Sequence, residues 1–138
     1  MARHQLTVPL RWADFDPLAH VNNVRYLEFM QDARISLIHD FGLPKSSLTE
    51  IGHLVAGNEI DYLRPVGMND HEIRIEIWIS RFGGASYDVE YAMYDASGAL
   101  CATAKSVMVT VEMATQAVIR IPDDVREAME KFFEAPTK

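Results

Sequence analysis

Alternating apolar and polar residues mark the clearest strand of the chain. From Ile73 to Ile79, isoleucine occupies every second position, and Arg74, Glu76 and Trp78 stand between. A period of two residues is typical of a strand with one buried and one solvated face. The pattern therefore predicts a strand over His71–Phe82.

Neighbouring segments continue this pattern. The sequence Phe82-Gly83-Gly84-Ala85 predicts a hairpin, because paired glycines supply the positive φ angles of a type I′ turn. Alternation resumes from Tyr87 to Met93, and Asp95-Ala96-Ser97-Gly98 forms the next turn. The remaining strands are predicted over Gln5–Asp14, Leu54–Leu63, Ala99–Met113 and, as an extension of the sheet, Ala117–Ile121.

A helical period separates the first two predicted strands. Asn22 or Asn23 is a suitable N-cap, and Gly42 followed by Leu43-Pro44 ends the segment. Apolar side chains spread well beyond one stripe of this helix, so we expect it to be buried over much of its circumference. Small residues in the last long strand would let the helix approach closely; these are Ala102, Ala104 and Ser106.

A second amphipathic helix is predicted after Pro122, with Val125, Met129 and Phe132 among its apolar positions. The elements then follow in the order β-α-β-β-β-β-α. A sheet built mostly from consecutive strands, with one long helix packed on it, is an α+β architecture.

Length and composition predict one globular domain over residues 1–138, with 49% apolar and 24% charged residues. No run of about 18 apolar residues occurs, and MARHQLTVPL lacks the basic-then-apolar layout of a secretory signal. The single cysteine, Cys101, cannot form an internal disulfide. We therefore expect a cytoplasmic protein with no membrane partner.

The net charge of −7, without a cluster of basic residues, argues against nucleic acid as a partner, because phosphate neutralisation supplies most of such binding. A small anionic ligand remains compatible, since it requires only a few arginines.

Candidate chemistry concentrates just before the long helix, at Asp14, Asp16, His20, Asn22 and Asn23. The first N–H groups of a helix lack internal partners, and the helix dipole makes that end positive. The N–H groups of Asn23 and Val24 would thus stabilise an oxyanion close to an ionised Asp16. Because a thiol has a pKa near ~8.5, a thiolate leaves without strong acid catalysis, so these groups suffice for a thioester.

The same residues also have structural explanations. Asp14 and Asp16 are of the type that forms local turn hydrogen bonds, and His20 fits a surface or capping position. Capping alone accounts for Asn22 and Asn23. Spacing by itself leaves both interpretations open.

Other site types fit less well. A calcium loop requires Asp or Asn in place of Leu18 and glycine in place of Ala19, and the remaining histidines are scattered, so we expect no metal. A serine nucleophile would lack the G-x-S-x-G elbow, and apolar burial opposes thiolate formation at Cys101.

The segment DFDPLAHVNNVRYLEFMQDAR resembles the opening of the hotdog-fold acyl-CoA thioesterases of the 4-hydroxybenzoyl-CoA thioesterase type. HVNN followed by Tyr26 is also similar to plant acyl-carrier-protein thioesterases. The likeness continues through YLRPVGMNDHEIRIEIWISRFGGASYDVEYAMYD to TQAVIRIPDDV. It implies a long helix wrapped by a curved antiparallel sheet, a homodimer or homotetramer with active sites at subunit interfaces, and no cofactor.

By this resemblance, Asp16 is the catalytic nucleophile or general base, and the Asn23 N–H polarises the thioester carbonyl. His20 would shape the loop or orient water. The substrate-binding positions are Asn22, Tyr26, Arg81 and Ser86. Some relatives carry basic residues before the matching serine, whereas this chain has Gly83-Gly84-Ala85 there.

The carrier and the acyl chain stay open at this stage. Coenzyme A could be held by Arg64, Arg81 or Lys105, by a neighbouring subunit, or loosely in solvent, and an acyl carrier protein is the alternative carrier. A non-catalytic acyl-binding or assembly module is a second hypothesis, which the carboxylate of Asp16 disfavours. A dehydratase of the same broad fold ranks below both, because His20 precedes the helix.

Overall fold

A computed structural model describes residues 3–136 of the chain. Its elements, in order, are β1 (His4–Pro9), a 3-10 turn η1 (Trp12–Asp14), α1 (Asn23–His39), α2 (Lys45–Glu50), β2 (Ile51–Tyr62), β3 (Glu72–Phe82), β4 (Ser86–Tyr94), β5 (Leu100–Glu112) and α3 (Asp123–Glu130).

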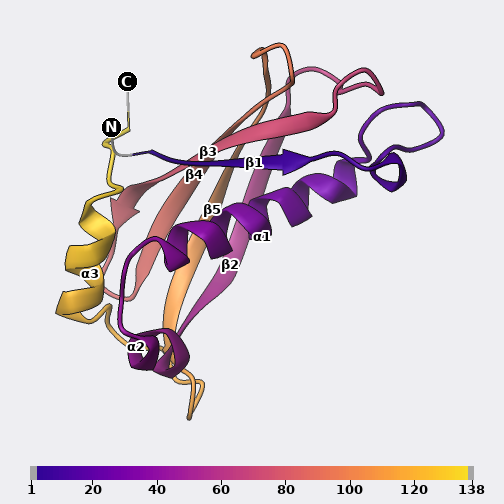
Figure 1. The fold of residues 1–138 in the computed structure, drawn as a ribbon. Coiled ribbons are helices and arrows are strands. Elements are labelled where there is room, and N and C mark those ends of the chain that lie inside the picture. The colour runs from indigo at the N-terminus through magenta and orange to yellow at the C-terminus, as the bar shows by residue number, and fades with distance from the viewer. Residues whose placement is uncertain (1–2, 137–138) are drawn as a thin grey trace.

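The five strands form one antiparallel sheet in the order β1-β3-β4-β5-β2, and α1 lies across one face of it (Figure 1). α3 lies beside the end of the sheet where both described termini meet (Figure 1). The predicted α+β arrangement is therefore present, with β1 and β2 as the two edge strands.

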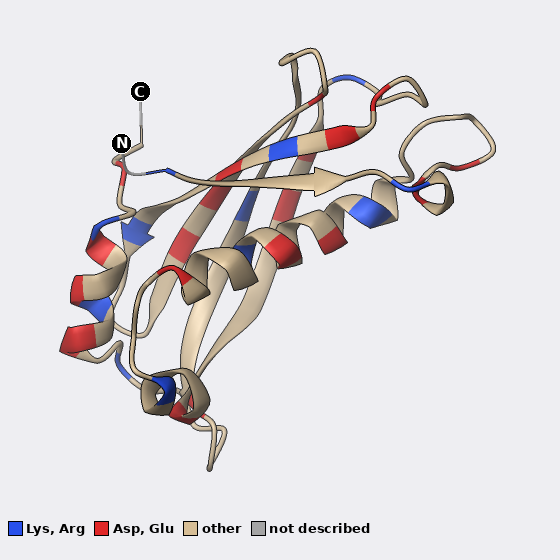
Figure 2. Ribbon diagram, in the orientation of Figure 1, with Lys and Arg blue, Asp and Glu red and all other residues tan. Residues whose placement is uncertain are grey.

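The sheet divides its side chains as the alternation predicts. Ile73, Ile75, Ile77 and Ile79 are fully buried beneath α1, together with the alternating apolar residues of β4. Polar residues occupy the opposite face, where Glu90 pairs in register with Lys105 and Lys105 with Glu59. Acidic and basic residues alternate over the elements instead of forming a field of one sign (Figure 2).

α1 differs from the sequence prediction in how much of its surface is buried. Tyr26, Met30 and Leu37 lie in the core, whereas Leu27 is 44% and Ile35 59% exposed. A single sheet covers only the side of the helix that faces it, so the expectation of burial over much of the circumference is wrong for one chain.

The β3–β4 connection also differs from the prediction. Neither Gly83 nor Gly84 has a positive φ, so the predicted type I′ turn is wrong. A Cβ on Gly83 would lie 2.7 Å from Ser86 Oγ and 2.9 Å from Arg81 Nη1. Close approach of these side chains, not a left-handed backbone, is what requires glycine there.

Three further boundaries differ from the expected ones. The first strand ends at Pro9, because the chain turns into η1, and α2 had no sequence prediction. Residues 117–121 follow β5 but pair with it only through a bridge between Val118 and Val111. Within residues 3–136, no helix is long and apolar enough to cross a membrane.

The imidazole of His53 gives the fold a predicted pH dependence. It is partly buried, its Nδ1 lies 2.8 Å from the Tyr87 hydroxyl, and burial lowers its pKa from 6.5 to about 4. Between those two pH values, His53 is therefore protonated in the unfolded chain but neutral in the folded one. We expect the stabilising contribution of neutral His53 to be fully present above pH 6.5. As the pH falls towards 4, the free energy of unfolding should decrease by roughly 2–3 kcal/mol.

Urea unfolding at several pH values measures this loss, and His53→Asn should remove that part of the slope. His71, which is exposed, supplies the matched control in His71→Asn. Equal slopes for the native protein and His53→Asn would contradict the assignment.

Candidate active site

A tight loop between η1 and α1 holds the Asp16 carboxylate. The Asp16 N–H donates to the His20 carbonyl (2.9 Å), and the Ala19 N–H donates to the Asp16 carbonyl (2.9 Å). Ala19 closes the loop with a φ of 61°. Asp16 Oδ1 accepts the Leu18 N–H at 2.9 Å and the His20 N–H at 3.4 Å. Backbone donors thus anchor one carboxylate oxygen, while Oδ2 has no hydrogen-bond partner among residues 3–136.

Asn22 determines which donor the helix offers. Its side-chain Oδ1 accepts the Val24 N–H at 2.9 Å, which makes it the N-cap of α1. Of the two donors expected from the sequence, Val24 is therefore occupied. The Asn23 N–H has no partner within the described part of the chain, so it is the group free to bind an oxyanion.

Asp16 and Asn23 line one pocket of about 400 Å³. The other lining residues are His20, Val21, Tyr26, Tyr62, Leu63, Arg64 and Pro65. The structure thus brings together four of the predicted site residues: Asp16, His20, Asn23 and Tyr26. Asn22 acts beside them as the cap.

Tyr62 is a pocket residue that the sequence interpretation missed. Its hydroxyl donates to the Asn23 carbonyl (3.1 Å), and its ring meets that of Tyr26 edge-on at 5.1 Å. Burial raises the pKa of both phenols, so each remains neutral at physiological pH. Only the return of β2 to the start of α1 places Tyr62 there, and no local motif signals it.

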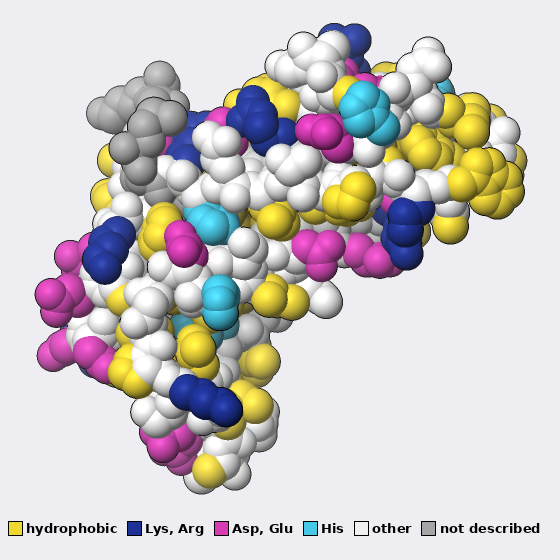
Figure 3. All heavy atoms as spheres, in the orientation of Figure 1, with side chains coloured by type: hydrophobic (Ala, Val, Ile, Leu, Met, Phe, Trp, Pro, Cys, Tyr) yellow, Lys and Arg dark blue, Asp and Glu magenta, His cyan; other side chains and the backbone are white. Residues whose placement is uncertain are grey.

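A second pocket of about 380 Å³ also includes Asp16, with Trp12, Phe15, Pro17 and Met68 among its other lining residues. Trp12 is 82% and Met68 54% exposed. Hydrophobic side chains gather at this tip of the molecule, over the loop that leads into α1 (Figure 3). Asp16 therefore lines both a mixed pocket and an apolar one.

Asp14 has a different role from Asp16. It is buried, its carboxylate accepts the Arg11 N–H at 2.8 Å, and it forms an ion pair with Arg25 of α1. Its carbonyl accepts the Asn22 N–H at 2.9 Å. These contacts clamp the loop to the first turn of the helix, which is a structural role.

Arg81 and Ser86 lie far from Asp16 in the same chain. Ser86 pairs in register with Val109, whereas Tyr62 pairs with Ala102, seven residues away along β5. At a rise of roughly 3.3 Å per residue, the two regions are about 23 Å apart. One chain therefore does not bring these predicted substrate-binding residues to the carboxylate.

The hairpin that carries Ser86 is nevertheless basic. Arg126 Nη1 donates to the Gly83 carbonyl at 3.1 Å, and Arg120 Nη1 comes within 3.7 Å of the position a Cβ on Gly84 would take. Together with Arg81, these residues surround the Gly83–Ala85 connection. Arg120 and Arg126 come to this loop from segments distant in the sequence, which residue spacing could not reveal.

Asp88 neutralises part of this charge. Arg81 donates to both Asp88 oxygens at 2.9 Å and to Ser86 Oγ at 3.1 Å. Burial disfavours the charged form of Asp88, but Arg81 and Lys105 outweigh it and lower its pKa. Arg81 Nη1 has no side-chain partner among the described residues, so one donor remains for an anion. Lys105 is instead directed to Asp88, at 3.4 Å.

Two other kinds of site find no support. Within residues 3–136, no three His, Cys, Asp or Glu residues are placed to hold a metal ion. Cys101 is buried in β5, and burial raises the pKa of its thiol to about 11, which disfavours the thiolate.

The fold is the α+β hotdog fold of solved thioesterase structures. A model of the thioesterase-like superfamily matches residues 10–129, and the chain belongs to that superfamily. The resemblance to hotdog-fold acyl-CoA thioesterases seen in the sequence is thereby confirmed.

Individual relatives cover nearly the whole chain. The long-chain acyl-CoA thioesterase FadM of Escherichia coli K12 is 26% identical over 129 residues, which span 92% of this chain and 97% of FadM. The PA5185 protein of Pseudomonas aeruginosa superposes with a TM-score of 0.85 at 29% identity, covering 97% and 94% of the two chains. A Thermus thermophilus thioesterase, crystallised with coenzyme A and zinc, gives 0.82 at 27% identity, covering 99% and 97%.

The Asp14 clamp can be tested through stability. Asp14→Ala removes the carboxylate that faces a largely buried Arg25, whose side chain is 22% exposed. We expect a loss of about 1–3 kcal/mol in unfolding free energy, because the Arg11 N–H loses its acceptor and Arg25 keeps only the exposed Glu28 as an ion-pair partner. Asp32→Ala, which removes an exposed carboxylate of the same helix, is the matched control and should change stability by less than about 0.5 kcal/mol. Similar effects of the two substitutions in urea unfolding would refute the clamp.

Proposed function

We propose that the protein hydrolyses acyl-CoA thioesters to the free acid and coenzyme A. One observation carries the proposal. Among the described residues, Asp16 has an unbonded carboxylate oxygen and Asn23 an unbonded N–H, and both residues line one pocket. Superfamily membership and the similarity to FadM, a long-chain acyl-CoA thioesterase, support the same reaction. A pure binding module has no reason to place an ionised carboxylate beside an acyl carbonyl.

The geometry accommodates attack on a carbonyl placed at the mouth of α1. The carbonyl oxygen accepts the Asn23 N–H, so charge that develops on it is stabilised by that donor and by the helix dipole. Asp16 Oδ2 either attacks the carbonyl carbon, giving an anhydride that water cleaves, or removes a proton from the attacking water. In both routes the C–S bond breaks and the thiolate leaves, which accounts for the lack of a strong general acid.

The substrate extends away from Asp16 in two directions. We assign the acyl group to the apolar pocket that contains Trp12 and Met68, because it offers apolar lining beside the carboxylate. The thiol arm then leaves through the pocket that contains Tyr62 and the exposed Arg64. We assign His20, which also lines this pocket, the role of orienting water.

Coenzyme A phosphates require more positive charge than this end of one chain supplies. β2 is a twelve-residue edge strand, whereas β1 has six residues and ends in Pro9, which lacks an N–H. β2 is therefore the edge able to pair with a second copy. An antiparallel β2–β2 pair places the Tyr62 end of one strand beside the Ile51 end of the other.

That arrangement brings the partner's basic hairpin towards Asp16. Ile51 pairs with Glu112, close to the Val109 that faces Ser86, so the hairpin lies at this end of the sheet. We propose a homodimer, or a tetramer of two dimers, in which Asp16 of one copy works with Arg81, Arg120 and Arg126 of the other. Exposed apolar residues on β2, Leu54 and Val55, fit such an interface.

Replacing the reactive oxygen tests the activity. Asp16→Asn should keep the fold but lower kcat/KM for acyl-CoA by roughly 10³-fold or more, as for other essential catalytic groups. Thiol release from a panel of acyl-CoAs measures it, with Asp32→Asn as a fully active control. Comparable turnover by folded Asp16→Asn would remove Asp16 from the mechanism. Hydrolysis of acyl-carrier-protein thioesters alone would change the carrier, and binding without turnover would favour a non-catalytic module.

Subunit mixing tests the shared site. Asp16→Asn and the double variant Arg81→Ala/Arg120→Ala should each be impaired alone at low substrate concentration. After exchange of subunits, a mixed dimer contains one site with both Asp16 and the arginines intact. Random association should restore about a quarter of native activity, since half of the dimers are mixed and each has one working site.

The mixing experiment requires that dimers dissociate and reassociate. Sedimentation at several protein concentrations is the control, because it should show a shift from monomer to dimer. If the arginines served Asp16 of their own chain, mixing would recover no activity beyond the sum of the separate variants.

A further inference from the structure

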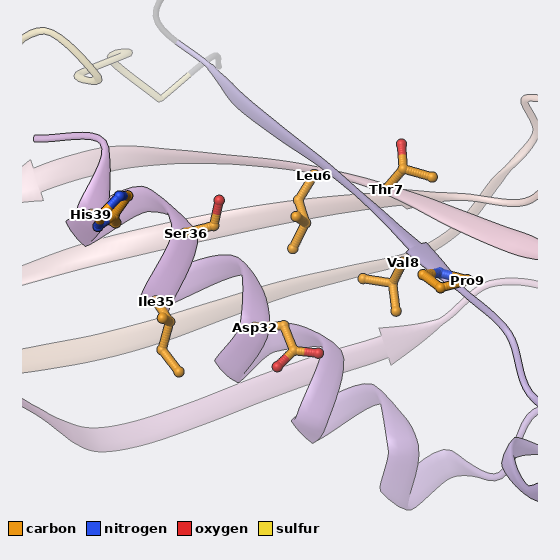
Figure 4. Close-up of a pocket in the computed structure, with 8 residues that line it drawn as sticks. All are labelled: Leu6, Thr7, Val8, Pro9, Asp32, Ile35, Ser36 and His39. Atoms are coloured by element: carbon orange, nitrogen blue, oxygen red, sulfur yellow. The ribbon is translucent and has the colours of Figure 1, made fainter.

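An apolar groove of about 470 Å³ separates β1 from α1, away from the site described above. Leu6 and Val8 line one wall, and Asp32, Ile35 and Ser36 line the other (Figure 4). Ser36 lies thirteen residues beyond Asn23 in α1, about 20 Å along the helix axis, so the groove is distinct from the Asp16 pocket.

Ser36 forms a hydrogen bond with His4 at this groove, and the Asp40 carboxylate lies near the second ring nitrogen of His4. Ser36 Oγ lies 2.7 Å from His4 Nε2, and His4 Nδ1 lies 3.3 Å from Asp40 Oδ2. In the tautomer that carries the proton on Nδ1, the serine hydroxyl donates to Nε2, and the Nδ1–H lies within ion-pair distance of the Asp40 carboxylate. This is the order of groups in which a base activates a serine nucleophile and an acid orients the base.

The surroundings hold the His4 imidazole in place and leave the serine accessible. The His4 side chain is only 15% exposed and meets the ring of Phe132 edge-on at 6.1 Å. A serine within a helix commonly bonds back to the carbonyl one turn earlier. Among residues 3–136 the Ser36 hydroxyl instead bonds to His4, and Ser36 lines the open groove.

The edge of β1 supplies a donor on the opposite wall. Leu10 donates to His71, so in this antiparallel register the even-numbered residues of β1 bond to β3 and the odd-numbered ones face away. The Thr7 N–H therefore points to the open side of the strand, where Thr7 lines the groove. It is available to the oxygen of a carbonyl held there.

We propose that this groove is a second acyl-transfer site, in which Ser36 is the nucleophile, His4 the general base and Asp40 a positioning residue. The groove lining includes Asp32 and, within the described residues, neither lysine nor arginine. A polyanionic coenzyme A is disfavoured there. The substrate class is instead a neutral carboxylic ester with a short apolar acyl chain.

The proposed reaction requires only Ser36, His4, the ester and water. Ser36 Oγ forms a bond to the carbonyl carbon while its proton passes to His4 Nε2. The ester C–O bond then breaks, and His4 returns the proton to the departing alcohol. Water, deprotonated by His4, later cleaves the acyl-serine to the acid and regenerates Ser36.

Reaction of p-nitrophenyl butyrate with the whole protein tests the proposal, followed by peptide mass spectrometry. We expect a burst of p-nitrophenol of one equivalent per chain and a butyryl group on the peptide that contains Ser36. The burst should persist in Asp16→Asn, which separates this site from the thioesterase site. Thioesterase activity should be unchanged in Ser36→Ala, whose burst is lost.

Three variants assign the roles. His4→Gln should slow acylation by roughly 10²-fold or more, the contribution of a general base. Asp40→Asn should slow it about tenfold without changing the half-saturating ester concentration, because Asp40 orients the base and does not touch the ester. Ser46→Ala, at an exposed serine of α2, should react like the native protein. Absence of a burst from native protein, or a butyryl group only on another residue, would overturn the proposal whatever the variants do.

Discussion

The buried ion pair between Asp14 and Arg25 is the interaction on which the active end of the molecule depends. It joins the loop before α1 to the first turn of that helix, and the Asp14 carbonyl also accepts the N–H of the capping residue. With the helix start held in this way, the Asn23 N–H and the Asp16 carboxylate keep a defined separation. The proposed catalytic arrangement relies on one donor and one carboxylate and has few other means of orienting its substrate, so rigidity here matters more than elsewhere.

The same sheet that buries α1 also leaves a long strand edge open. Five antiparallel strands cover one side of the helix, and two strand edges remain unpaired. The longer edge belongs to β2, which leads directly to Tyr62 and the Asp16 pocket. Pairing along this edge would satisfy backbone groups and join the two halves of the proposed site in one step.

In the two proposed sites, α1 serves different chemistry at its two ends. Its N-terminus offers an unpaired N–H and a positive dipole, which suit a developing oxyanion. Near its C-terminus, Ser36 and Asp40 lie one turn apart on the same side, where the first residues of β1 pass. The helix therefore positions one carboxylate-based and one serine-based group without overlap between their pockets.

Local periodicity was sufficient to predict much of this protein. The alternation around Ile73–Ile79 predicted β3, and the asparagines before α1 together with Gly42 predicted the helix ends. The motif from Asp14 to Asn23 predicted that Asp16, His20 and Asn23 would lie together, because all of them belong to one short loop and the turn that follows it. Turns and caps are local properties, so the order of residues carries them.

What the sequence could not decide involves residues brought together from distant segments. Tyr62 reaches Asn23 only because β2 returns beside α1, and Arg120 and Arg126 surround Gly83–Ala85 only because the chain after β5 folds back to the hairpin. The partial exposure of α1 and the contact between His4 and Ser36 likewise depend on where the sheet ends. Short-range pattern specifies each element and its caps, whereas packing and strand order specify which elements meet.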